Sequence, residues 1–213
     1  MPLVPPWCVR CGAPSRRDVD GCRHCPPVPI ASARAPFLFD GPVRRAVHRL
    51  KFAGWRPVAE ALGRAMAEVT EAEVDVITWV PLSERRRVSR GYDQARALAR
   101  VVGVRRRLPV APLLRRTGDP PTSQARRTGQ ERRLAMRGLF EPTADPPRRV
   151  LLVDDVLTTG ATAGACAEQL VAAGAREVSL LTAARAASGA VADLYSPGRL
   201  GSGSVVARGR SPR

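Results

Sequence analysis

The sequence predicts an α/β fold in which a mostly parallel sheet is flanked by helices. The main support is a strand–helix–strand succession at residues 149–182, where a continuous apolar run, a helical segment and a second apolar run follow one another. A run rich in β-branched residues at 74–80 adds a further strand. Hydrophobic residues make up 44% of the chain and aromatic residues 4%, so the core must be built mainly from aliphatic side chains.

Apolar periodicity defines the individual elements. Helices are expected at 41–52, 57–69, 92–102 and 161–173, and strands at 74–80, 110–114, 149–153 and 178–182. In the first helix, Pro42 suits the first turn, and the residues placed broadly on one side are Val43, Val47, Leu50 and Phe52. His48 lies off that stripe and is expected at the surface. The arginine-rich stretch 115–137 is expected to be a mobile loop followed by a partial helix.

Four of the five cysteines form two C-x-x-C pairs, Cys8 with Cys11 and Cys22 with Cys25. A C-x-x-C turn places two thiolates on one side of a tight knuckle, and two such turns complete the tetrahedron that zinc prefers. The residues between the pairs offer few apolar side chains, so a bound metal would supply the folding energy. The pattern predicts a structural zinc site, although the same ligands would suit an iron–sulfur cluster and a C-x-x-C pair also occurs in redox proteins.

The chain is expected to divide into three parts. Residues 1–30 would form the four-cysteine zinc element and a proline-rich linker, 31–186 the α/β domain, and 187–213 a disordered tail without periodicity. No stretch approaches the roughly 20 consecutive apolar residues that span a bilayer, and the N-terminus is too proline-rich for a signal peptide. We therefore expect no membrane insertion, a cytoplasmic location and no disulfides.

The most informative stretch is 150–162. A buried strand delivers Asp154 and Asp155 at its carboxyl end, and a Thr-Thr-Gly turn leads directly into a helix. Unpaired N–H groups at the start of that helix, together with hydroxyl donors, suit a phosphate monoester. The two carboxylates can accept hydrogen bonds from the cis hydroxyls of a ribose, so the stretch predicts a cradle for a ribose 5-phosphate. Alternatively, Thr158 is a helix cap and Asp154 a turn residue.

Residues 150–162 resemble the phosphoribosyl-pyrophosphate (PRPP) binding motif of type I phosphoribosyltransferases. The wider chain resembles the ComF competence family, a branch of that fold with an N-terminal four-cysteine zinc element. The resemblance rests on four segments in the family's order: the cysteine pairs, 40–52, 80–95 and the PRPP motif. It departs at Asp93 and Ala135, where the family usually carries asparagine.

The resemblance implies a fold of the type I phosphoribosyltransferase kind and a role for each motif. Asp154 and Asp155 would hold the ribose hydroxyls, and the residues around the 5-phosphate would be Thr158, Thr159, Gly160, Ala161 and Thr162. The loop facing the pyrophosphate would comprise Pro81, Leu82, Ser83 and Arg85, with Mg²⁺ arriving together with PRPP. Arginines of the segment 115–137 could neutralise the charge of the departing pyrophosphate. No acceptor pocket is recognisable, so turnover of PRPP and binding without turnover both remain open.

The charge predicts attraction to polyanions. Lysine and arginine number 35 against 19 acidic residues, giving a net charge of +16, and the only lysine is Lys51. Arginine in this amount also reflects the codon bias of a GC-rich genome, but its distribution is uneven. Residues 84–107 contain nine arginines and two acidic residues, and 115–137 contain seven and two.

Such clustering suggests a groove for single-stranded DNA. The arginines expected to contact the backbone are Arg85, Arg86, Arg87 and Arg90, and the nearest aromatic residues are Tyr92 and then Phe140. The family resemblance adds the DNA-uptake machinery as a possible partner. A merely solvated basic face, or a regulator without either activity, are the alternatives.

Overall fold

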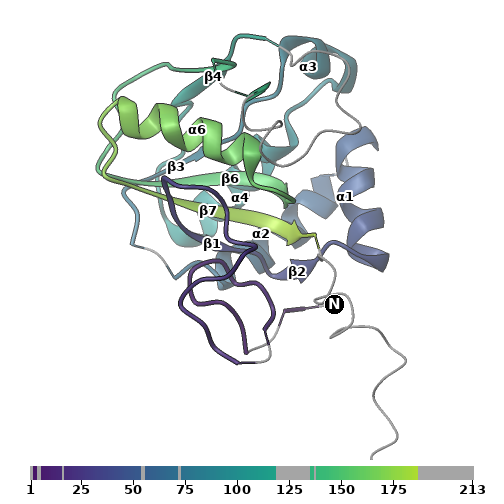
Figure 1. Ribbon diagram of the computed structural model, residues 1–213. Coiled ribbons are helices and arrows are strands. Elements are labelled where there is room, and N and C mark those ends of the chain that lie inside the picture. The colour runs from purple at the N-terminus through teal and green to yellow at the C-terminus, as the bar shows by residue number, and fades with distance from the viewer. Residues whose placement is uncertain are drawn as a thin grey trace, which may run out of the picture.

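A parallel sheet forms the centre of the protein (Figure 1). The computed structural model describes residues 2–186 except 4, 5, 16, 54, 55, 72, 119–134 and 137. The strand order is β1-β7-β6-β3, with β2 pairing β7 beyond the end of β1, and every pair in this sheet is parallel. The strands are β1 (Ile30–Arg34), β2 (Phe37–Leu38), β3 (Val76–Trp79), β6 (Arg149–Leu157) and β7 (Glu177–Arg185). The predicted α/β class with a mostly parallel sheet is therefore confirmed.

Helices cover both faces of the sheet (Figure 1). One face packs against α6 (Ala161–Ala172), and the other against α1 (Gly41–Ala53), α2 (Arg56–Glu68) and α4 (Gln94–Arg106). The short helix α3 (Glu84–Arg90) follows β3, and β4 (Leu114–Arg116) pairs with β5 (Phe140–Pro142) in a separate antiparallel ladder. No helix in the described part of the chain is both long and apolar enough to cross a membrane.

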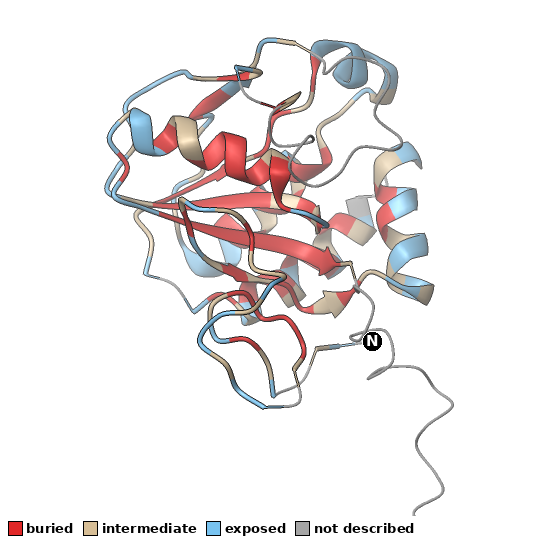
Figure 2. Cartoon of the chain, viewed as in Figure 1, coloured by how far each residue is buried: buried red, intermediate tan, exposed pale blue. Residues whose placement is uncertain are grey.

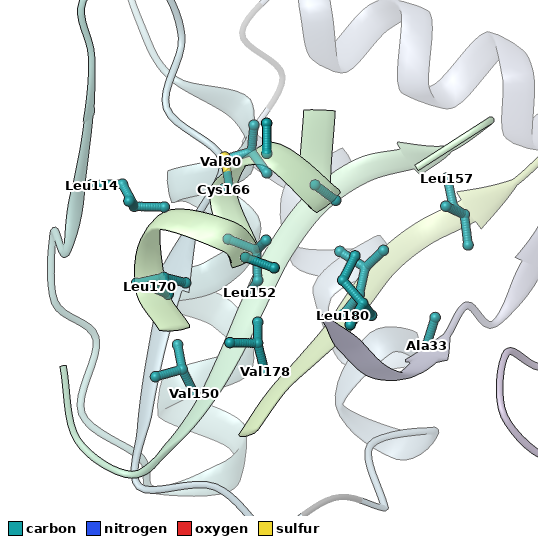
Figure 3. Close-up of a cluster of buried hydrophobic side chains, with 14 of the residues drawn as sticks. Ala33, Val80, Leu114, Val150, Leu152, Leu157, Cys166, Leu170, Val178 and Leu180 are labelled. Atoms are coloured by element: carbon teal, nitrogen blue, oxygen red, sulfur yellow. The ribbon is translucent and has the colours of Figure 1, made fainter. Parts of the chain in front are cut away.

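The core consists of two aliphatic layers separated by the sheet. Because side chains alternate along a strand, Val150 and Leu152 of β6 face α6, whereas Leu151 and Val153 face α2 and α4. Figure 3 shows the first layer, in which Cys166 and Leu170 of α6 lie over the strands. The same alternation carries on to the two aspartates that follow, and it sends their side chains to opposite faces of the sheet.

Several elements differ from the sequence-based expectation. Neither β1 nor β2 was predicted, nor were α3, β4 and β5, and β6 and β7 extend beyond the expected ends at residues 153 and 182. Of the strand expected at 110–114, Val110 forms one parallel bridge to Ile77, and the regular pairing begins at Leu114. Most of the stretch 115–137 and the whole of the expected tail at 187–213 lie outside the described residues.

One side chain of α1 was placed wrongly. Phe52 was expected on the inward stripe, but it is 64% exposed, whereas Val47 and Leu50 are buried as expected. His48 is exposed, as predicted.

Candidate functional site

A cavity of about 240 Å³ lies at the carboxyl end of β6, where the strand turns into α6. This edge of a parallel sheet is where α/β proteins bind ligands. The cavity is lined from four directions: β6, the turn into α6, β7 and two arginines on other segments. The lining residues include Asp154, Thr158, Thr159, Gly160, Ala161, Thr162, Thr182, Arg86, Arg116 and Met136. The structure thus brings together most of the predicted phosphate-loop residues.

The turn between β6 and α6 presents hydrogen-bond donors to the cavity. Gly160 is at the N-cap position in the left-handed region, with φ of +71°, and it provides no side-chain cap for α6. The Thr159 hydroxyl accepts a hydrogen bond from the Ala161 N–H at 3.4 Å. The N–H groups of the first turn of α6, which point away from the helix toward its N-terminal side, suit an anion.

The two aspartates of the motif have different surroundings. Asp154 lines the cavity, whereas Asp155 is not part of its lining and is buried on the other face. There, Asp155 forms an ion pair with Lys51 at 2.9 Å and accepts a hydrogen bond from the Gln94 amide at 3.2 Å. The only lysine of the chain therefore holds the second aspartate from α1.

Electrostatics further separates the two carboxyl groups. Burial raises the pKa of Asp154 to about 8, and the neighbouring Asp155 carboxylate adds to the rise, while Lys51 opposes it. A carboxyl group in this state is protonated below about pH 8 and can donate as well as accept a hydrogen bond.

The predicted pyrophosphate loop positions α3. Ser83 is its N-cap, because its hydroxyl accepts a hydrogen bond from the Arg86 N–H. Asp93 caps α4 in the same way, and its second oxygen accepts a hydrogen bond from the Leu82 N–H at 3.4 Å. The Asp93 carboxylate thus ties the loop to α4. Of this part of the chain, Arg86 reaches the cavity, whereas the predicted Pro81, Leu82, Ser83 and Arg85 are not in its lining.

Sequence reasoning named neither Met136 nor Lys51 for this site, and it included Arg116 only as one of the arginines of the stretch 115–137. Arg116 lies on β4, where its guanidinium donates a hydrogen bond to the Gly118 carbonyl at 2.8 Å and lies over the Phe140 ring. Met136 contacts the hydroxyl of Thr162. The signal for Lys51 is that it is the single lysine among so many arginines, and the signal for Arg116 is the arginine cluster to which it belongs. For Met136 the sequence offered none.

The four cysteines form the second candidate site. Their sulfur atoms lie within 4.8 Å of one another, which confirms the predicted clustering. The Sγ–Sγ distances are 3.7 Å for Cys8 to Cys25, 3.6 Å for Cys11 to Cys22 and 3.9 Å for Cys22 to Cys25. Tetrahedral zinc with Zn–S bonds of about 2.3 Å requires S–S edges of about 3.8 Å. The cluster therefore has the size and ligand chemistry to hold a zinc ion.

The cysteine cluster packs directly against the α/β domain. Cys8 and Cys11 belong to the same core layer as α6, and Arg185 at the end of β7 donates hydrogen bonds to the carbonyl and the sulfur of Cys11. A zinc ion with four thiolates carries a net charge of −2, which the buried Arg185 partly balances. After Cys25 the chain runs beside the turn between β6 and α6. Pro26 and Pro27 lie so close to Gly160 that a Cβ added there would come within 3.0 Å of both prolines.

The residues predicted to contact nucleic acid lie on α3. No residue of this helix is buried, and Arg85, Arg86 and Arg87 are exposed. Arg87 forms an ion pair with Glu84 at 2.6 Å. Phe140, which was expected among the aromatic residues nearest to these arginines, is in the core with 1% exposure.

The comparisons with known proteins give only a distant likeness. No protein-family model and no curated protein matches the chain. It is similar to glutamine phosphoribosylpyrophosphate (PRPP) amidotransferase from B. subtilis, solved with ADP and GMP, with 22% identity and a TM-score of 0.41 over 57% of this chain and 25% of that one. A structure described as the allosteric regulatory enzyme of purine biosynthesis gives 22% identity and a TM-score of 0.40, over 59% of this chain and 25% of that one.

The chain thus spans a quarter of the length of each of these two proteins. At TM-scores below 0.5 the likeness defines no function, and the α/β class rests on the strand order and layers described above.

Proposed function

We propose that the cavity at the carboxyl end of β6 binds a phosphoribosyl ligand, with PRPP as the first candidate. The supporting observation is that the motif residues of the turn, an uncapped helix start and two arginines all line the same cavity. A phosphate monoester fits the hydroxyl and N–H donors of the turn, and a ribose fits the neighbouring Asp154.

The remaining groups have distinct parts in this proposal. Arg86 and Arg116 would neutralise the charge of the pyrophosphate, which Mg²⁺ would accompany. For Asp155 to reach a ribose hydroxyl as well, it would have to leave its ion pair with Lys51, because it lies outside the cavity lining. The proposal also includes a type I phosphoribosyltransferase-like architecture. It further includes the division of the chain into a zinc element at 1–30, an α/β domain at 31–186 and a tail at 187–213.

Calorimetry with PRPP and Mg²⁺ tests the binding site. Changing Asp154→Asn together with Asp155→Asn should weaken binding measured at pH 9, where the Asp154 carboxyl is ionised and a hydrogen bond to a charged group contributes about 1.5–3 kcal/mol. Thr159→Val should weaken it by removing a donor to the phosphate. Asp75→Asn is the matched control, because this carboxylate pairs with Arg149 at the opposite edge of the sheet. Unchanged affinity in the double Asn variant would refute the proposed site.

The second part of the proposal is binding of single-stranded DNA by the arginines of α3. It is favoured by their exposure on a helix that buries no residue. Neutralising Arg85, Arg86 and Arg90 should lower the salt dependence of binding by about 0.7 for each DNA phosphate that an arginine no longer neutralises. The matched control neutralises the three exposed arginines at the other end of α4, Arg105, Arg106 and Arg107. Equal reductions from both sets would mean that only the net charge matters.

On this view the protein is a ComF-like, cytoplasmic protein of DNA uptake, with the DNA-uptake machinery as its partner. The support for this part is the resemblance of the four sequence segments. The alternative is an active phosphoribosyltransferase that transfers ribose 5-phosphate to an acceptor, and the two arginines in the cavity favour it. Release of pyrophosphate from PRPP across a panel of bases, amines and nucleic acids distinguishes the two, since activity with one small acceptor would support the enzyme.

A further inference from the structure

We propose that Phe52, at the end of α1, is a stacking platform for one base of a single-stranded nucleic acid. This inference rests on the proposed binding of single strands by α3 and adds the residue that would contact a base. Phe52 is 64% exposed, and it is the one aromatic residue among the exposed large hydrophobic side chains of the described residues. A single exposed apolar side chain is common on protein surfaces, so the inference rests on the neighbours of this ring.

The ring is held in place by two neighbours. His48, one turn earlier on α1, has its ring centroid 4.6 Å from that of Phe52, at an interplanar angle of 41°. Arg90 of α3 places its guanidinium over the Phe52 ring, 5.2 Å from the centroid. A ring with restricted freedom loses less entropy when a base stacks on it, and more than half of the side chain is accessible.

Positive charge lies on both sides of Phe52. His48 belongs to the lining of a hollow of about 480 Å³ along α1, which contains three arginines and one aspartate. Arg90 belongs to the lining of a second hollow of about 760 Å³, where four arginines accompany two acidic residues. Phe52 therefore contacts one residue of each hollow, and the outer surfaces of α1 and α3 are largely exposed (Figure 2). A sugar–phosphate backbone crossing here would meet arginines before and after the stacked base.

The chemistry favours a nucleic acid over a protein partner. A protein interface needs a contiguous apolar patch at its centre. On α1 and α3 the described residues with large exposed apolar side chains are Phe52 and Val88 alone, set among arginines. A base presents a flat apolar face next to a phosphate charge, and stacking on an aromatic side chain is largely independent of sequence.

The test compares an oligothymidylate with a strand of equal length that carries the same sugars and phosphates without bases. Phe52→Ala should weaken binding of the oligothymidylate about 5- to 150-fold, which corresponds to about 1–3 kcal/mol for one stacked base. The salt dependence should not change, because no charge is removed. Binding of the baseless strand should also be unaffected, and Phe52→Trp should retain affinity for the oligothymidylate.

Val104→Ala serves as the control for truncating an exposed apolar side chain, since Val104 is 79% exposed near the far end of α4. Circular dichroism and thermal unfolding check that Phe52→Ala folds. If the wild-type protein binds the oligothymidylate and Phe52→Ala binds it equally well, the stacking platform is refuted and the arginine surface stands. An equal weakening on the baseless strand also refutes it. Failure of the wild-type protein to bind either strand refutes both this inference and the proposed DNA binding.

Discussion

The cysteine cluster and the cavity at the end of β6 differ in how their residues are assembled. All four cysteines come from one short segment, and two turns suffice to bring their sulfur atoms within 4.8 Å of one another. The cavity takes residues from α3, β4, β6, α6 and β7, which only the complete fold brings together. A site whose ligands lie in one short segment can be predicted from their spacing in the sequence. For a site assembled from distant segments, only the longest continuous segment can be predicted in this way.

The two regions nevertheless touch. Pro26 directly follows the last cysteine, and with Pro27 it lies against Gly160, at the centre of the phosphate turn. The cysteine cluster and the cavity are therefore in contact although they are assembled differently. A change in one of them is expected to alter the stability or ligand affinity of the other.

The largest expected effect is loss of the metal. Cys8→Ser with Cys22→Ser should reduce bound zinc from one ion per chain to none, because two of the four ligands are removed. Structural zinc contributes about 10–16 kcal/mol in small zinc domains, so a marked fall in melting temperature should follow. Metal analysis and thermal unfolding measure both effects.

The control for this variant is Cys166→Ala, because Cys166 is buried in the same core layer but lies outside the cluster. It should keep its zinc. PRPP affinity of the double serine variant then decides whether the regions are coupled: an unchanged affinity would mean that the cavity forms without the metal.

A smaller effect concerns the cavity alone. The pKa of Asp154 is raised to about 8, far above the value of about 3.9 of an unfolded chain. Between about pH 4 and pH 8 the folded state therefore binds more protons than the unfolded state, and the free energy of unfolding falls as the pH rises. Asp154→Asn should flatten this dependence in urea unfolding at pH 5 and pH 8.

Asp75→Asn is a control of opposite sign. Its hydrogen bonds with Arg149 lower the pKa of Asp75, so its contribution is complete above about pH 4 and disappears only toward lower pH. The dependence between pH 5 and pH 8 should be the same as in the unaltered protein. A dependence that survives in Asp154→Asn would assign the titration to another group.

The smallest expected effect tests the contact between the regions. Gly160→Ala adds a Cβ within 3.0 Å of Pro26 and Pro27 at a φ of +71°. The free energy of unfolding should therefore fall by more than the roughly 1–2 kcal/mol expected for an alanine in the left-handed region. Gly91→Ala has nearly the same φ, +73°, with nothing within 4 Å, and isolates the backbone cost.

Urea unfolding and PRPP calorimetry of both variants separate the two costs. We expect only Gly160→Ala to weaken PRPP binding. A double-mutant cycle with Pro26→Gly should restore part of the stability and affinity. Equal free energies of unfolding of the two alanine variants would show that Pro26 and Pro27 move aside without any loss of stability.

The extent of successful prediction follows the same division between local and assembled features. The cysteine cluster and the succession of β6, turn and α6 were predictable because each is one continuous segment with its own periodicity. Arg116 and Met136 were not, because their place in the cavity depends on the pairing of β4 with β5 and on the path of the chain between them. β1 was missed because its sequence, IASAR, contains one large apolar residue, whereas β2 has only two residues.

The prediction that Phe52 faces inward was wrong, and strict helical periodicity in the sequence would have excluded it. At 100° per residue Phe52 lies about 200° beyond Leu50, on the opposite side of the helix. Its apolar character suggested burial, whereas strict helical periodicity places it outward, where the structure has it.

Lys51 gives the protein a chemical handle. Because it is the only lysine, an amine-reactive reagent has one side chain to label, and this side chain is 27% exposed and 2.9 Å from Asp155. A fluorophore or isotope attached through that amine would report on the surroundings of Asp155, provided that the N-terminal amine, which titrates at lower pH, is blocked first. Acylation of the same nitrogen would abolish its charge and leave the buried Asp155 carboxylate without its counter-ion, so one chemical modification both labels this ion pair and breaks it.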